Sequence, residues 1–283
     1  MLYYLLLLLI PIVSCCQSAS QKQYNLKYEK PNVILFSAVT SVIALMFFII
    51  TSGFRLDFDV RLIPYSLGFA VSYASAWVTT VLAVRYGLMA ISSLIVSCSL
   101  VFPTVYGMIL GEPVTAKIII GLMLIFASIV LVNLKFSDKG KFSLKWLACV
   151  LVAFLGNGVC SIMQNMQKRL VGDSYTHEFM IIALAAASVM LFAYAAFTGK
   201  GLMRDLKACL PYSAANGIAN ALANFLLLLI IGNIPNTILY PTNAALGMIF
   251  TFLLASIVYK EKFTLPQYIG YGLGMASIVM LNI

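Results

Sequence analysis

The sequence predicts an all-α integral membrane protein with ten transmembrane helices, arranged as two inverted five-helix repeats. The class follows from composition, because 62% of the 283 residues are hydrophobic and only 10% are charged. Soluble domains carry about 25% charged residues. The mean hydropathy of +1.00 agrees with a chain embedded in a lipid bilayer. The arrangement follows from the spacing of the apolar segments and from an internal repeat.

Ten apolar segments approach the length of roughly 20 residues that a helix needs to cross a bilayer. They span 2–24, 32–52, 64–84, 88–110, 115–134, 144–167, 177–197, 209–231, 236–259 and 265–283. Short polar breaks separate them. The basic stretch 135–143 is the natural linker between a first unit, 1–134, and a second unit, 144–283.

The internal repeat lies at the end of each unit. At an offset of 149 residues, ten of the 22 positions in 112–133 are identical to those in 261–282. The chain is therefore two copies of one unit. Because five crossings is an odd number, the second copy must enter the bilayer upside down. Inverted repeats are a transporter architecture in which the substrate site lies where the halves meet.

The first segment has two interpretations. Residues 12–15 resemble a lipoprotein processing site, so the segment 2–24 could be a cleaved signal. However, no Lys or Arg precedes the apolar run, and the Gln-Lys pair at 21–22 aligns with the pair at 167–168 in the sixth segment. A helix with a counterpart in the second unit is expected to be retained.

The closing segment of each unit begins with helix-capping residues. Thr264 is a plausible N-cap, and Gln267 three residues later completes a capping-box arrangement. Thr115 occupies the same position in the first unit. Glu112 and Glu261 precede these caps, where an acid is favoured by the helix macrodipole. We expect both glutamates to be structural.

The repeat resembles a known domain. In the first copy the stretch 87–94, the turn 111–115, Gly121 and the run 127–130 resemble the EamA domain of the drug/metabolite transporter superfamily. The second copy matches through 241–252, the pair at 260–261, Thr264, Gly270 and Ala276, and departs from the pattern at Lys260, where the domain has Gly. The resemblance covers essentially the whole chain as two tandem domains.

This resemblance implies a carrier of metabolites, amino acids, nucleotide sugars or drugs. It also implies that the path lies between the first four helices of each repeat, with the fifth peripheral. The closing helices would then be scaffold or the surface of a homodimer. Gly270 and Gly274 form a GxxxG motif suited to close helix packing, within one chain or between two.

The eighth segment has the sharpest polar pattern. Asn216, Asn220 and Asn224 are spaced i, i+4 and i+8, and so share one helix face. At an offset of 145, Ser75 and Thr79 are the counterparts of Asn220 and Asn224. We expect these residues to line a cavity for a polar solute, since carboxamides both donate and accept hydrogen bonds. The alternative is interhelical hydrogen bonding.

Further candidate solute-binding residues lie on the other segments. On the first and sixth segments, Gln17 and Gln21 share one face, as do Gln164 and Lys168. The lysine either attracts an anionic group or snorkels to the headgroups. The set of candidate solute-binding residues is completed by Tyr73 and Trp77, as aromatic walls, and by the amide side chain of Asn243.

Several function classes are disfavoured. The chain has one His, six Cys without CxxC spacing, and no acidic residue in the middle of an apolar segment. We therefore expect no enzyme, metal site or cofactor, and a neutral or anionic solute in preference to a cationic drug. The net charge of +9 suits an anionic lipid surface better than nucleic acid. We expect a secondary carrier of small metabolites in the cell membrane, with a multidrug efflux carrier or a non-transporting receptor as alternatives.

The orientation stays open. Loops after odd-numbered segments hold thirteen Lys and Arg residues and the opposite loops hold five, which places both termini outside by the positive-inside rule. The family resemblance implies both termini inside.

Overall fold

The computed structural model describes residues 2–28, 32–54, 56–86, 95–96, 98–133, 144–198, 202–258, 260 and 263–282. These residues are almost entirely helical, and no β-strand occurs among them apart from an isolated bridge between Ile231 and Ile234. The helices are α1 (Leu2–Lys27), α2 (Val33–Thr51), α3 (Leu62–Tyr86), η1 (Cys98–Leu100), α5 (Val101–Ile109), α6 (Ala116–Asn133), α7 (Leu144–Leu170), η2 (Asp173–Tyr175), α8 (Thr176–Thr198), α9 (Leu202–Ile230), α10 (Asn236–Leu253), the π-helix η3 (Leu254–Val258) and α11 (Leu265–Asn282). The linker 135–143 and Glu261 lie outside the described residues.

Six helical segments are long and apolar enough to cross a membrane. They are Leu2–Lys27, Val33–Thr51, Leu144–Leu170, Asp173–Phe197, Asp205–Ile230 and Asn236–Val258. Three shorter apolar helices accompany them: Cys98–Ile109, Ala116–Val132 and Leu265–Leu281. The chain is therefore an all-α membrane protein, as the composition predicts.

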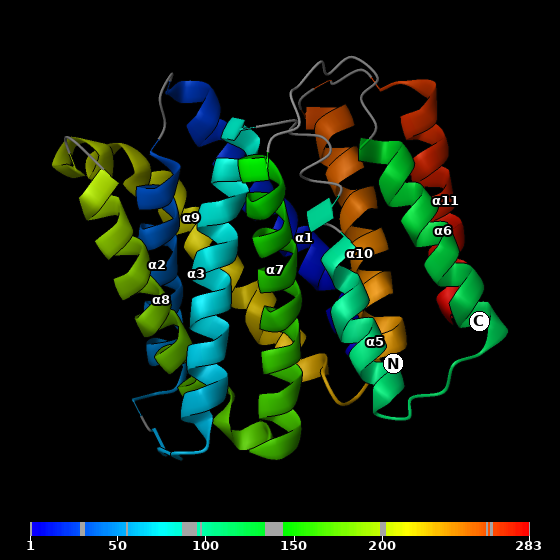
Figure 1. Cartoon of the computed structure of the whole chain (residues 1–283), viewed down its shortest axis with the longest axis horizontal. Helices are drawn as coiled ribbons and strands as arrows, with labels where there is room; N and C mark the ends of the chain where they lie inside the picture. Colours follow the sequence, from blue (N-terminus) through cyan, green and yellow to red (C-terminus); the bar gives the residue numbers. More distant parts are fainter. Residues whose placement is uncertain are drawn as a thin grey trace.

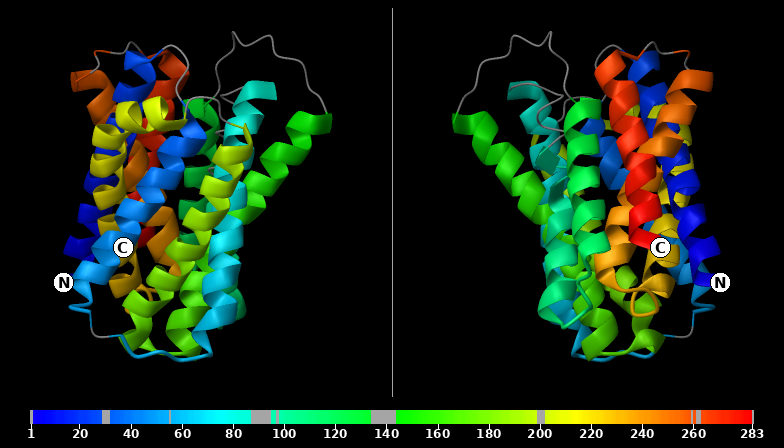
Figure 2. Two further views of the ribbon diagram at one scale, coloured as in Figure 1. Left: turned by 90° about the vertical axis from the view of Figure 1, so that its left-hand side faces the viewer. Right: turned by 90° about the vertical axis from the view of Figure 1, so that its right-hand side faces the viewer.

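The helices form two groups that meet along α1, α7, α9 and α10. In the first group α3 packs against α7 and α8, and α9 packs against α1 and α2. In the second group α6 pairs with α11, while α10 contacts α11, α1 and α5. Figure 1 shows α2, α3 and α8 on one side of the molecule and the α6–α11 pair on the opposite side, and the right-hand view of Figure 2 shows that pair facing the viewer.

The packing is paired across the two halves of the sequence. In chain order, the counterparts of α1, α2, α3, α5 and α6 are α7, α8, α9, α10 and α11. If each helix is replaced by its counterpart, the α3–α7 contact becomes the α9–α1 contact, and the α2–α9 contact becomes the α8–α3 contact. The α5–α7 contact likewise becomes the α10–α1 contact. Each half therefore buries its helices mainly against the other half.

Buried serines join α6 to α11 reciprocally. Ser128 on α6 donates to the Gly270 carbonyl at 2.5 Å, and Ser277 on α11 donates to the Gly121 carbonyl at 2.9 Å. Gly121 and Gly270 are equivalent positions of the sequence repeat, as are Ser128 and Ser277. The same bond is thus made twice, once in each direction.

A second reciprocal pair joins the other group of helices. Ser66 on α3 donates to the Phe179 carbonyl of α8 at 3.2 Å, and Ser213 on α9 donates to the Phe36 carbonyl of α2 at 3.3 Å. Both serines are fully buried. Interhelical bonds of this kind contribute about 0.6–2 kcal/mol each in membrane proteins.

The GxxxG motif of α11 packs within the chain. A methyl group added at Gly270 would lie 2.8 Å from a Val132 side-chain carbon, and one added at Gly121 would lie 2.6 Å from Leu281. Gly274 faces Ser128 in the same interface. Only glycine lets the two backbones approach this closely.

The helix starts follow the capping pattern in part. Thr115 accepts a hydrogen bond from the Ile118 amide at 3.3 Å, and the Thr264 amide donates to the Gln267 side chain at 2.9 Å. Glu112 reaches a different helix from the one it precedes. Its carboxylate accepts from the Thr237 amide at 2.9 Å, and so caps the N-terminus of α10 instead of α6.

Candidate functional site

A cavity of about 370 Å³ lies between α3 of the first half and α7 and α9 of the second. This volume falls at the small end of the range for small-molecule sites, about 300–1,000 Å³. Its described walls are made by Phe69, Tyr73, Ala76, Trp77, Thr80, Val96, Asn157, Cys160, Ser161, Gln164, Asn224 and Leu227.

One wall is aromatic and comes from α3. Phe69, Tyr73 and Trp77 follow each other at four-residue intervals and therefore share a helix face. The Phe69 and Tyr73 rings are stacked with centroids 5.7 Å apart, and the Tyr73 and Trp77 rings meet edge to face at 6.4 Å. Each ring packs on the next, so the three form one aromatic row in which Phe69 and Tyr73 are buried and Trp77 is half-buried.

The opposite wall is made of amides and hydroxyls on α7 and α9. Gln164 donates from its side-chain nitrogen to the Asn224 side-chain oxygen at 2.9 Å, which links the two helices. Asn224 donates to the Asn220 carbonyl at 2.9 Å, and Asn157 donates to the Ala153 carbonyl at 2.9 Å. A carboxamide has two N–H donors and an acceptor oxygen, so these bonds orient the amides and use only part of their capacity.

Four of the residues predicted from the sequence line this cavity: Tyr73, Trp77, Gln164 and Asn224. Asn220 lies one helical turn from Asn224 and accepts from it through its backbone and, at 3.3 Å, through its side chain. The structure therefore brings together candidates from α3, α7 and α9 that are far apart in the sequence.

The remaining candidates lie outside the described lining. Ser75 and Thr79 donate to carbonyls of their own helix, at 3.0 Å and 2.6 Å. Asn216 is buried and donates to the Gln17 carbonyl at 2.8 Å, which ties α9 to α1. Gln21 on α1 and Asn243 on α10 are half-buried and do not line the cavity.

Lys168 is turned away from the cavity. Its side chain is buried, its ammonium group donates to the Leu228 carbonyl of α9, and it lies 3.6 Å from the Asp173 carboxylate. Neither the anion-binding nor the snorkelling interpretation describes this arrangement, since the lysine joins α7 to α9 and to the turn that follows α7.

Several lining residues were missed by the sequence analysis. Asn157 and Ser161 on α7 are two of them, and with the predicted Gln164 they are spaced i, i+4 and i+7 along the wall of the cavity. That spacing is visible in the sequence and is the signal that could have found them. On α3 the lining face passes through Ala76 and Thr80, one residue away from the predicted Ser75 and Thr79.

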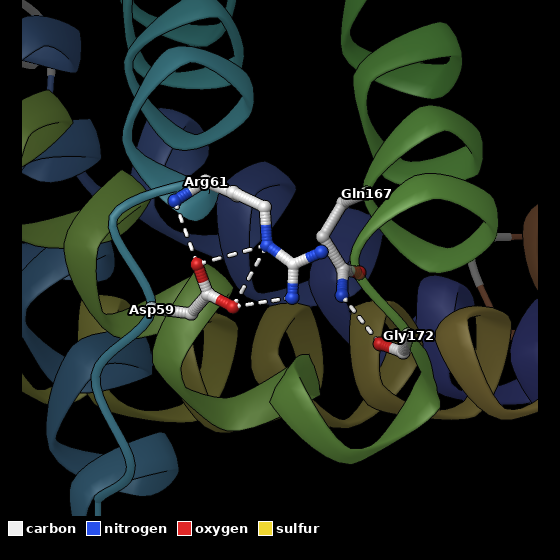
Figure 3. A network of polar contacts seen from close by, with 4 residues as sticks. All are labelled: Asp59, Arg61, Gln167 and Gly172. Atoms are coloured by element: carbon white, nitrogen blue, oxygen red, sulfur yellow. Dashed lines mark hydrogen bonds and ion pairs between the residues drawn. The ribbon is translucent and has the colours of Figure 1, made fainter.

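The cavity wall carries no Asp, Glu, Lys, Arg or His side chain in the part of the chain that the structure describes. Charged groups gather instead where α3 begins and α7 ends. Figure 3 shows Arg61 held by Asp59 and reaching toward Gln167, which donates to the Gly172 carbonyl at 3.0 Å. Arg61 contacts the Asp59 carboxylate at 2.7 Å, and this hydrogen bonding lowers the pKa of Asp59.

Glu112 is part of the same end of the molecule. In addition to capping α10, its carboxylate lies 3.7 Å from the Arg169 guanidinium of α7. The turn before α6 is thereby joined to two helices of the second half. These contacts close the bundle at the end where α7 terminates.

The comparisons with known proteins identify a fold and no family. No protein-family model matches the chain, and no curated protein matches it. Twenty-eight chains of solved structures are similar. One, described only as "Crystal structure of protein", superposes with a TM-score of 0.76 over 99% of this chain and 98% of its own length. At 13% identity, that likeness shows that the two chains share a fold.

Proposed function

We propose that the chain is a secondary transporter of small metabolites that works by alternating access between two inverted repeats of the EamA type. The observation that carries this proposal is the cavity, whose aromatic wall comes from the first half and whose amide wall comes from the second. A solute held between two repeats is released to either side when one repeat moves against the other.

The inverted-repeat arrangement with ten crossings is supported by the paired contacts. Ser66 and Ser213 are 147 residues apart and make equivalent bonds to the opposite half. Gly121 and Gly270 are 149 residues apart and accept equivalent bonds. Two copies of one unit related by a two-fold axis produce such reciprocal contacts, and the axis of inverted repeats lies in the membrane plane.

The chemistry of the cavity favours an uncharged solute over a cationic drug. Carriers of cations use a membrane-embedded carboxylate that exchanges protons for substrate. Among the described acids, Glu178 is buried but lies in the first turn of α8 and accepts from the Asp57 amide at 3.2 Å, and Glu112 is engaged by Arg169 and by the α10 N-terminus. The proposed role is that of a metabolite carrier in the cell membrane.

The test is counterflow in sealed vesicles that contain the purified protein. Vesicles loaded with an unlabelled solute are diluted into the same solute in labelled form, and a carrier accumulates label transiently. We expect saturable counterflow for at least one uncharged metabolite, and a loss of about fivefold or more with Gln164→Leu, since one bond to the solute contributes about 1 kcal/mol or more.

The control is Asn233→Leu, because Asn233 is exposed and bonds only to the nearby Leu229 carbonyl. Counterflow that Asn233→Leu and Gln164→Leu reduce equally would argue against the cavity as the site. Vesicles that bind solutes without counterflow would contradict the transporter and favour a receptor.

A further inference from the structure

The described walls of the cavity favour uncharged solutes. Among the described lining residues there is no charged side chain to neutralise a carboxylate, an ammonium group or a phosphate. Burial of an unpaired ion carries a large desolvation penalty. A zwitterionic amino acid would meet that penalty at both ends.

On the three described helices that line most of the cavity, backbone groups do not replace the missing charges. Some carriers bind charged solutes at the ends of broken helices, where free N–H or C=O groups point at the ligand. Here α3 (Leu62–Tyr86), α7 (Leu144–Leu170) and α9 (Leu202–Ile230) run unbroken past the cavity. Even at Leu227, near the end of α9, the carbonyl accepts from the Ile231 amide at 3.0 Å.

The two walls instead match a flat solute with a polar edge. The α3 wall presents the half-buried ring of Trp77, backed by the buried rings of Tyr73 and Phe69, and aromatic side chains are the surfaces on which nucleobases stack. The facing amides of Gln164 and Asn224 are of the type that pairs with base edges, because Asn and Gln donate and accept side by side. Both features occur in one cavity, on opposite helices.

We propose that the solute of this site is an uncharged nucleobase, either free or as part of a nucleoside. The base lies against the α3 aromatic wall, and its edge bonds to the amides of α7 and α9. This inference rests on the proposed transport function for the route of the solute, but binding itself does not depend on transport.

Trp77 provides a direct readout of binding. The chain has two tryptophans, Trp77 in the cavity wall and Trp146 in the first turn of α7. In the purified Trp146→Phe variant, all tryptophan fluorescence comes from the cavity. The fluorescence is titrated with adenine, adenosine, uracil and uridine, and separately with phenylalanine, glucose and the cation tetraphenylphosphonium.

We expect saturable quenching of Trp77 by at least one base or nucleoside, and at least about tenfold weaker binding in the same background with Asn224→Leu, while Asn233→Leu leaves binding unchanged. Adenine binding without adenosine binding assigns the free base, and the converse assigns the nucleoside. Saturable quenching by phenylalanine, glucose or the cation with none by bases overturns the proposal.

The transport assay separates the two claims. Nucleobase binding without counterflow in vesicles overturns the transporter and leaves the binding site intact. Counterflow of phenylalanine or glucose without any nucleobase binding overturns the solute class and leaves the transporter intact. Quenching by none of the solutes overturns the solute class as well.

Discussion

The α6–α11 interface and the cavity between α3, α7 and α9 both join the two halves of the chain, but they are built from different residues. At the first, glycines bring the backbones together and buried serines bond to the opposite helix. At the second, aromatic rings and amides line about 370 Å³ of space, while α3 and α7 pack closely beside it, since a methyl group added at Gly156 would lie 2.8 Å from the Ser72 carbonyl oxygen. The glycines and serines fix α6 against α11, whereas the aromatic and amide side chains line a space for a solute.

The difference follows from the membrane environment. Lipid tails are as apolar as leucine, so helices in a bilayer associate through close packing and hydrogen bonds. The cavity interrupts that close packing locally. The α6–α11 pair is therefore suited to be a scaffold, and the cavity is suited to change its exposure.

The largest expected effect on stability comes from placing a large side chain in the α6–α11 interface. Gly270→Leu drives a side chain into Val132, which lies 2.8 Å from an added methyl group. We expect a loss of stability of about 3 kcal/mol, at the upper end for overpacking. Thermal unfolding of the purified protein measures it.

The matched control is Gly272→Leu on the same helix, because no atom lies within 4 Å of a methyl group added there. If Gly272→Leu lowers the melting temperature as much as Gly270→Leu, close packing against Val132 does not determine the effect, because the gain in helix propensity from Gly to Leu is the same at both positions.

The next effect should appear in function and leave the fold intact. Asn224→Asp keeps the shape of the side chain and places a carboxylate in the cavity wall beside Gln164. We expect at least about tenfold weaker binding of an uncharged solute. The substitution removes both N–H donors of the side chain, and the added charge favours water in the site over an uncharged solute. A variant that instead binds uncharged solutes more tightly would contradict this account of the cavity.

A smaller effect tests the reciprocal bonds of the scaffold. Ser128→Ala and Ser277→Ala each remove one interhelical hydrogen bond and should each cost about 0.6–2 kcal/mol. Because the two bonds lie at equivalent places, the two costs should be similar, and solute binding should not change. Unequal losses in thermal unfolding would show that the two serines are not equivalent.

The smallest effect concerns the exposed pair at the start of α3. The guanidinium of Arg61 lowers the pKa of Asp59 in the folded protein. A lowered folded-state pKa stabilises the fold above the ordinary Asp value of about 3.9, and this contribution is lost as the pH falls through the folded-state pKa. Asp59→Asn should therefore lower the melting temperature slightly near neutral pH, and the difference from the unaltered protein should shrink toward about pH 3.

Much of the fold could be predicted from the sequence, because apolar length and the repeat are both visible in the chain. The ten predicted segments all overlap helices, although 88–110 is described only in part. The rotation of each helix about its axis was harder to predict. Polar residues on α3 occur on more than one face. The repeat offset therefore predicts Ser75 and Thr79 as lining residues, whereas Ala76 and Thr80 line the cavity.

The candidate site was predicted in part for the same reason. Regular spacing identified Asn224, but it could not separate that residue from Asn216, which bonds to the Gln17 carbonyl of α1. Lys168 could not be placed, because its partners, Leu228 and Asp173, are determined by tertiary packing. The offset between the two copies predicts which helices face each other. The direction in which each side chain points depends instead on how the helices pack against one another.

The central claim, that the cavity between the halves is exposed alternately to the two sides of the membrane, is tested most directly at Cys160. This residue lines the cavity, and a variant that keeps only Cys160 among the six cysteines can be treated in sealed vesicles with a membrane-impermeant thiol reagent from either side. The account predicts that Cys160 reacts from both sides and that the transported solute slows both reactions. Reaction from one side only, with or without solute, would contradict it.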